Sequence, residues 1–127
     1  MIRVVRLGSP RQHGEGLRLG TVRRPPRGVR RSDYAAQDWY DVWLPLLAPS
    51  AATVKLGQTA DSPARWSVFA RKYWAEMKAP ECRQVIALLA ELSHHADFSV
   101  GCYCADESRC HRSLLRELLA RQGAFLA

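Results

Sequence analysis

Residues 98–104, Phe-Ser-Val-Gly-Cys-Tyr-Cys, form a short apolar run that predicts a β-strand. A helical pattern follows almost at once, because four leucines after the connecting loop (residues 105–109) fall on one stripe: Leu114, Leu115, Leu118 and Leu119. A strand that passes so directly into a helix is typical of layered α/β domains. This junction constrains the fold more than any other segment.

Two strands are predicted before this junction. Residues 2–7 are apolar and β-branched, residues 17–23 alternate between apolar and polar, and the turn-rich residues 11–16 connect them. Pro25-Pro26 ends the second strand, because proline cannot donate to a sheet ladder. A basic loop, residues 24–32, follows.

Three helices are predicted between these strands and the last one. Ser32 or Asp33 can cap the first, whose apolar stripe is Tyr34, Trp39, Trp43, Leu46 and Leu47; residues 49–61 read as loop. Ser62-Pro63 predicts the start of the second helix, with an aromatic face of Trp66, Phe69, Tyr73, Trp74 and Met77. Pro80 opens the third, with a stripe of Val85, Leu88, Leu89 and Leu92.

The predicted order is β-β-α-α-α-β-α. At 127 residues the chain has the length of one domain, so residues 1–127 are expected to form a single α/β domain. Its sheet would be small, mixed or parallel, and flanked by helices. Ligands of such sheets bind beyond the carboxyl ends of the strands. The loops after the second and third predicted strands share that edge only if those strands run parallel.

The positive charge is concentrated in the first quarter of the chain. The net charge is +7, and residues 1–31 hold nine arginines against one acid, Glu15. Arginine suits bidentate contact with phosphate, so one interpretation is a surface for a polyanion or a phosphate ester. The other is a solvated basic face. Residues 1–31 contain no Phe, Trp or Tyr, which argues against a platform for stacking single-stranded nucleic acid.

No targeting signal is visible in the sequence. The longest apolar runs fall short of the roughly 18 residues that a membrane span needs. The N-terminus carries arginine from the third residue onward and lacks the apolar stretch of a signal peptide. We therefore expect a cytoplasmic, reducing environment and no membrane partner.

The most informative local feature is a group of cysteines around the strand-helix junction. Cys102, Cys104, Cys110 and His111 lie within ten residues. Cys102 and Cys104 would share one face of a strand. Cys110 and His111 would begin the helix, where free backbone N–H groups and the helix dipole favour anions and lower the pKa of a thiol.

Four interpretations of this group remain open. The first is a reactive or anion-binding pocket. The second is a zinc or iron site made by Cys102, Cys104, Cys110 and His111. The third is a redox disulfide between two of these cysteines, and the fourth is a set of small core residues. The Cys-x-Cys and Cys-His spacing differs from the usual paired zinc knuckles, and no Cys-x-x-Cys is present.

Several stretches resemble the uncharacterised family called domain of unknown function 488, which includes the YeaO-like proteins. They are residues 6–19 (R-L-G-S-P-R-Q-H-G-E-G-L-R-L), 22–28 (V-R-R-P-P-R-G), 47–50 (L-A-P-S), 65–77 (R-W-x-x-F-x-x-x-Y-x-x-E-M) and 102–115 (C-Y-C-A-D-E-S-R-C-H-R-S-L-L). The last is similar to the cysteine-bearing branch that ends in C-H-R-S.

The resemblance implies a compact α/β domain of bacterial type and no established reaction. Arg23 and Arg27 match its arginine loop and are the best N-terminal site candidates, with the C-H-R-S turn as the second half. Val22 stands where the family has aspartate, so any role of that aspartate is lost or moved in this chain.

The leading functional hypothesis is a pocket for a phosphate-bearing small molecule or nucleotide. Arg18, Arg23, Arg27, Arg112 and Ser113 would bind the ligand. Cys102, Cys104 or Cys110 would serve as a nucleophile and His111 as a proton carrier. The alternatives are a non-catalytic nucleic-acid-binding module and a metalloprotein that uses the cysteine group. The apolar stripes fit one core, so they neither require nor exclude an oligomer.

Overall fold

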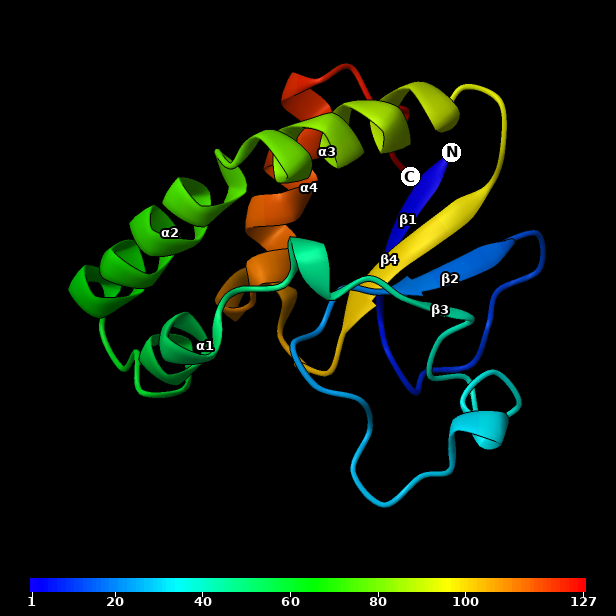
Figure 1. Cartoon of the computed structure of the whole chain (residues 1–127), viewed down its shortest axis with the longest axis horizontal. Helices are drawn as coiled ribbons and strands as arrows, with labels where there is room; N and C mark the ends of the chain where they lie inside the picture. The colour runs from blue at the N-terminus through cyan, green and yellow to red at the C-terminus, as the bar shows by residue number, and fades with distance from the viewer.

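The computed structural model describes residues 1–127 and contains one four-stranded parallel sheet, ordered β1-β4-β2-β3 (Figure 1). The strands are β1 (Ile2–Arg6), β2 (Leu17–Gly20), β3 (Val42–Trp43) and β4 (Phe98–Cys102). β4 lies between β1 and β2 and is buried along its whole length, as central parallel strands usually are. The predicted α/β class is confirmed, and the sheet is of the parallel kind.

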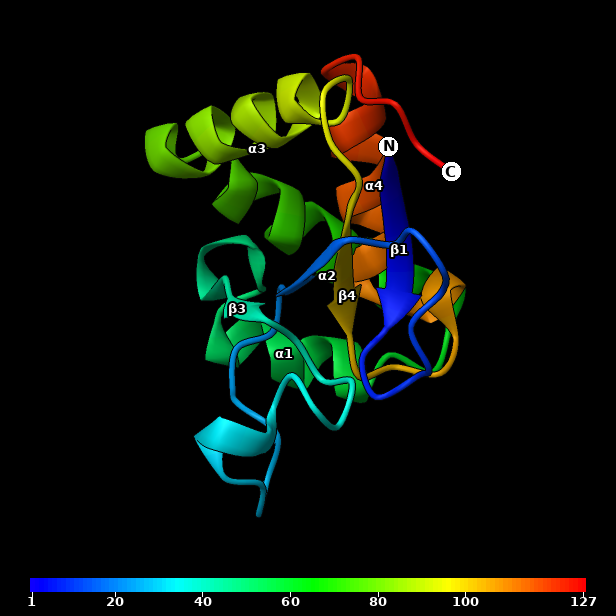
Figure 2. The same cartoon turned by 90° about the vertical axis from the view of Figure 1, so that its right-hand side faces the viewer.

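Four α-helices complete the fold: α1 (Ala51–Gln58), α2 (Pro63–Met77), α3 (Pro80–Leu92) and α4 (His111–Arg121). Figure 1 shows α2 and α4 to one side of the sheet, and Figure 2 shows them behind it. The main core lies between these helices and one face of the sheet. It includes Ile2, Leu19, Phe98 and Val100 from the strands and Phe69, Tyr73, Ile86, Leu115 and Leu119 from the helices.

The opposite face of the sheet is covered by the connection between β1 and β2. Arg18 pairs in register with Ser99, one step from the core pair Leu19 and Val100, so both side chains point away from the helices. Glu15, from the connection, accepts hydrogen bonds there from Arg18 at 2.7 and 2.9 Å and from Ser99 at 2.8 Å. All three side chains are buried.

The helix starts predicted from proline and serine are confirmed. Ser62 caps α2 by accepting the backbone N–H of Arg65, and Pro63 is the first helical residue. Phe69, Tyr73 and Met77 of the predicted aromatic face are buried. α3 begins at Pro80, and α4 begins at His111 with Cys110 at its cap position.

The prediction for residues 32–61 is wrong. Where a helix was expected, the chain has a 3₁₀ turn (Arg31–Asp33), strand β3 and a second 3₁₀ turn (Pro45–Leu47), and the expected loop contains α1. Pairing with β2 decides the first difference, because the Leu44 N–H donates to the Gly20 carbonyl. Asp38 also has a φ of 61°, which no α-helix accommodates.

α1 depends on a partner far away in the sequence. Ser50 caps it by accepting the Thr53 N–H, and Glu76 from α2 accepts hydrogen bonds from the Ser50 N–H and hydroxyl. Gly57 lets the Phe69 ring approach, since an added Cβ would lie 2.8 Å from that ring. These tertiary contacts are invisible in the local pattern of residues 49–61.

Candidate functional site

Strands β1, β2 and β4 end at one edge of the sheet. They are mutually parallel, so their carboxyl ends, near Arg6, Gly20 and Cys102, lie together. The expectation that the loops after the second and third predicted strands share an edge is therefore confirmed. α4 begins at the same edge, where its first residues meet the end of β4.

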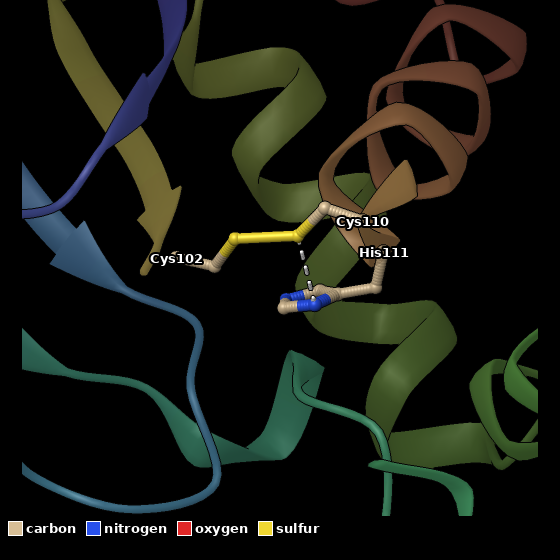
Figure 3. A group of neighbouring side chains, drawn as sticks. All are labelled: Cys102, Cys110 and His111. Atoms are coloured by element: carbon tan, nitrogen blue, oxygen red, sulfur yellow. Dashed lines mark hydrogen bonds between the residues drawn. A yellow bond between two sulfur atoms is a disulfide. The ribbon is translucent and has the colours of Figure 1, made fainter. Parts of the chain in front are cut away.

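Cys102, Cys110 and His111 converge here and form what we call the thiol cluster. Cys102 is the last residue of β4, Cys110 caps α4, and His111 is the first residue of that helix. The sulfur atoms of Cys102 and Cys110 are in contact, drawn as a disulfide in Figure 3, with the His111 ring beside them. The two sulfurs and a ring nitrogen all lie within 4.8 Å of one another, and all three residues are buried.

The protonation of His111 follows from its hydrogen bonds. Its Nε2 lies 2.7 Å from the carbonyl oxygen of Thr21, which can only accept, so Nε2 carries the proton. Nδ1 is then left with a lone pair that faces the Cys110 sulfur at 3.7 Å. Burial lowers the pKa of His111 to about 4, so the ring is neutral near pH 7. A neutral imidazole with a free Nδ1 can accept a thiol proton or bind a metal ion.

Cys104 does not join the thiol cluster. β4 ends at Cys102, so the prediction that Cys102 and Cys104 share a strand face is wrong, and the Cys104 side chain is exposed. The backbone leaves the sheet after Cys102, and the Tyr103 carbonyl accepts a hydrogen bond from the Arg6 side chain at 3.2 Å. Cys104 contributes its own carbonyl oxygen to the Arg112 guanidinium at 2.6 Å.

A basic cleft opens beside the thiol cluster, and we call it the arginine cleft. Its volume is about 820 Å³, and Arg6, Arg24, Arg27, Trp39 and Tyr103 are among its eleven lining residues. No aspartate or glutamate lines it. The rings of Trp39 and Tyr103 meet edge to face with centroids 5.9 Å apart, and the Tyr103 hydroxyl donates to the Arg24 carbonyl.

The cleft and the thiol cluster are neighbours. Leu7 lines the cleft and also packs in one apolar cluster with Cys102 and Cys110. Tyr103 of the cleft directly follows Cys102. Val22, where the family resemblance implies an aspartate, is buried in that same apolar cluster, so the position contributes packing and no charge.

Of the predicted N-terminal arginines, only Arg27 lines the cleft. Arg18 is fully buried, and its guanidinium donates to Glu15, Ser9 and Asp38. Arg23 donates to the carbonyls of Pro45, Ala48 and Pro49 and so ties down the segment before α1. Both side chains therefore stabilise the fold, and neither lines the cleft.

Arg112 and Ser113 begin α4 as predicted, but neither lines the cleft. The Ser113 hydroxyl donates back to the Cys110 carbonyl. Arg112 is buried, its Nη2 reaches only the Cys104 carbonyl, and its Nε has no hydrogen-bond partner. Burial lowers the pKa of Arg112, and the nearby charge of Arg6 acts in the same direction.

Sequence reasoning missed four residues of the cleft: Arg6, Arg24, Trp39 and Tyr103. The two arginines belong to the basic quarter: Arg6 ends β1, and Arg24 lies in the loop that follows β2. The aromatic residues lie outside that quarter, Trp39 shortly after it and Tyr103 near the other end of the chain. Only the parallel arrangement of β1, β2 and β4 brings them beside the arginines.

These features define a parallel α/β protein with a basic cleft and a buried thiol cluster at the carboxyl edge of its sheet. A family profile described as the active DUF488-N3 subclade matches residues 2–123, so the chain belongs to the DUF488 family. The resemblance stated from the sequence is thereby confirmed. No curated protein and no solved structure matches the chain significantly. None of the helices is both long and apolar enough to cross a membrane.

Proposed function

We propose that this protein binds a phosphate-bearing small molecule of the nucleotide type in the arginine cleft. The observation that carries this proposal is the convergence of three arginines on one cleft that no carboxylate lines. Arginine offers planar, paired donors that match phosphate oxygens. An uncompensated group of guanidinium ions favours an anionic ligand over a neutral one.

Two of these arginines are available to a ligand. Arg24 and Arg27 are exposed, and neither guanidinium has a hydrogen-bond or ion-pair partner within the chain. Arg6 is also exposed, although its Nε donates to the Tyr103 carbonyl at 3.2 Å. This edge of the sheet therefore presents side chains whose donors are free to meet phosphate oxygens.

The two aromatic side chains that line the cleft favour a nucleotide over a simple phosphate ester. Trp39 and Tyr103 lie in the same cleft as the arginines, and base-aromatic stacking contributes about 1–3 kcal/mol. The cleft's volume, about 820 Å³, falls within the range of small-molecule sites, about 300–1,000 Å³. Its place at the carboxyl edge of a parallel sheet is where such folds bind ligands.

The arginines proposed here to bind the ligand differ from those expected from the sequence. It keeps Arg27, adds Arg6 and Arg24, and assigns Arg18 and Arg23 to the fold. The start of α4 lies behind the cleft and contributes positive charge through Arg112 without lining it. The proposal concerns binding, and it assigns no reaction to the thiol cluster.

Calorimetric titration with adenosine monophosphate, inorganic phosphate and adenosine tests this proposal. We expect the monophosphate to bind at least about tenfold more tightly than adenosine, a difference of about 1.4 kcal/mol. Arg24→Ala and Arg27→Ala should each weaken the monophosphate about tenfold, and Trp39→Ala should weaken it by a similar factor. Arg71→Ala, an exposed arginine of α2 outside the cleft, is the matched control and should leave affinity unchanged.

Two outcomes would count against the cleft. One is wild-type affinity in both arginine variants. The other is binding of a short oligonucleotide, but of no mononucleotide, with affinity that falls steeply with salt concentration. That result would support the nucleic-acid-binding alternative, because release of many counterions produces the steep dependence.

A further inference from the structure

We infer that the thiol cluster is a binding site for a soft divalent metal ion, with zinc as the best-matched ion. The inference is independent of the proposed nucleotide site, because it depends on different side chains. It starts from the convergence of the Cys102 sulfur, the Cys110 sulfur and a His111 ring nitrogen within 4.8 Å. Thiolate and imidazole are the ligands that zinc prefers, and two cysteines with one histidine make a known catalytic zinc set.

His111 is already oriented as a metal ligand. Its Nε2–H donates to the Thr21 carbonyl at 2.7 Å, and this leaves Nδ1 unprotonated on the side of the sulfurs. Metal-binding histidines usually donate their second ring N–H to a carbonyl or carboxylate, which fixes the tautomer and the ring. The Thr21 carbonyl at the end of β2 fills that position here.

The backbone spacing favours an ion over a disulfide between the two cysteines. Their Cα atoms lie 7.9 Å apart, whereas the Cα atoms of disulfide-bonded cysteines usually lie about 4.4–6.8 Å apart. Cys102 ends the central strand and Cys110 caps α4, so closing that spacing would require the backbone of one of these elements to move. In the reduced state the two sulfurs would face one shared point between β4 and α4.

Three protein ligands leave a four-coordinate ion one open position. Structural zinc sites generally close with a fourth protein ligand, whereas catalytic sites keep that position for water or substrate. Cys104, the fourth ligand that the sequence suggested, is exposed and outside the cluster. The ion would lie behind Leu7, next to the arginine cleft. On binding, the ion replaces the two thiol protons, which pass to solvent, and no oxidation occurs.

Cobalt titration of the reduced, metal-free chain tests the inference, with Co²⁺ as a spectroscopic substitute for Zn²⁺. We expect one ion per chain, a thiolate-to-cobalt charge-transfer band, and loss of that band when Zn²⁺ displaces cobalt. Cys102→Ser and Cys110→Ser should each weaken binding by more than about 100-fold, the upper end of losses for outer ligand partners. Cys82→Ser, buried elsewhere in the core, and Cys104→Ser, exposed nearby, are the matched controls and should bind normally.

A second measurement uses only the wild-type chain, so a folding defect in a variant leaves the test intact. Alkylation mapped by mass spectrometry should show Zn²⁺ slowing the modification of Cys102 and Cys110 but not of Cys104. The inference is overturned if the reduced chain takes up no stoichiometric metal. It is also overturned if metal binding survives both serine substitutions, or if a Cys102–Cys110 disulfide persists in excess reductant.

Discussion

Arg18 donates two hydrogen bonds to the carboxylate of Glu15, at 2.7 and 2.9 Å, in a fully buried pair on the sheet face away from the helices. The remaining Arg18 donors reach the carbonyls of Ser9 and Asp38. The pair therefore links β2 to both loops that lead toward the arginine cleft. The pair is thus one of the contacts that hold those loops in place.

Removing the charge of Glu15 should destabilise the protein strongly. Glu15→Gln leaves the buried Arg18 guanidinium without its counterion, a loss that typically costs about 3–5 kcal/mol. Urea unfolding followed by circular dichroism measures the change. The control is Glu117→Gln on the exposed side of α4. It removes a carboxylate charge that has no ion-pair partner, so it should change the free energy of unfolding by less than about 0.5 kcal/mol. Equal stabilities for the two variants would contradict the structural role of the pair.

The same pair predicts how stability depends on acid. Burial by itself would raise the pKa of Glu15, but hydrogen bonds from Arg18 and Ser99 outweigh it and lower the pKa from 4.5 to about 2. A depressed folded-state pKa gives stability that is present above pH 4.5 and lost as the pH falls toward 2. The contribution is about 3 kcal/mol. Unfolding measured from pH 5 to pH 2 should show this loss in the wild type and a flatter dependence in Glu15→Gln.

Gly16 is required for the close approach of the β1–β2 connection to β4. It has a φ of 77°, and an added Cβ would overlap the Asp97 carbonyl just before that strand. Gly16→Ala should therefore cost roughly 3 kcal/mol or more. Gly14→Ala separates the two causes, because Gly14 has a similar φ of 75° and open space around it. We expect that control to lose only about 1–2 kcal/mol in thermal or urea unfolding.

Ser50 holds α1 to α2 and should be needed for the helix. Ser50→Ala removes the cap on the Thr53 N–H and the hydroxyl donor to Glu76, and caps of this kind contribute about 1–2 kcal/mol. Compared with the wild type, the Ser50→Ala variant should show faster amide hydrogen exchange in α1 but not in α3. Ser67→Ala, whose exposed hydroxyl bonds only within α2, should leave both helices protected. Unchanged exchange in α1 would show that packing alone forms it.

The elements that the sequence predicted correctly are those with signals inside a few residues. Serine followed by proline starts α2, proline starts α3, and the leucine stripe marks α4. Residues 32–61 carried the same kinds of signal, yet β3 forms there because the Leu44 N–H meets the Gly20 carbonyl of β2. A hydrogen bond across 24 residues outweighs an apolar stripe that only resembles a helix.

The candidate site shows the same contrast between what local sequence signals predict and what tertiary contacts decide. The sequence by itself placed Cys102, Cys110 and His111 at one predicted strand-helix junction, within ten residues of one another, because the apolar strand and the leucine stripe are both local signals. Only the tertiary structure decided that Cys104 stays outside, that Arg18 serves the fold, and that Trp39 and Tyr103 join Arg24 and Arg27. Those outcomes depend on the register of parallel strands and on burial, which residues distant in the chain set jointly.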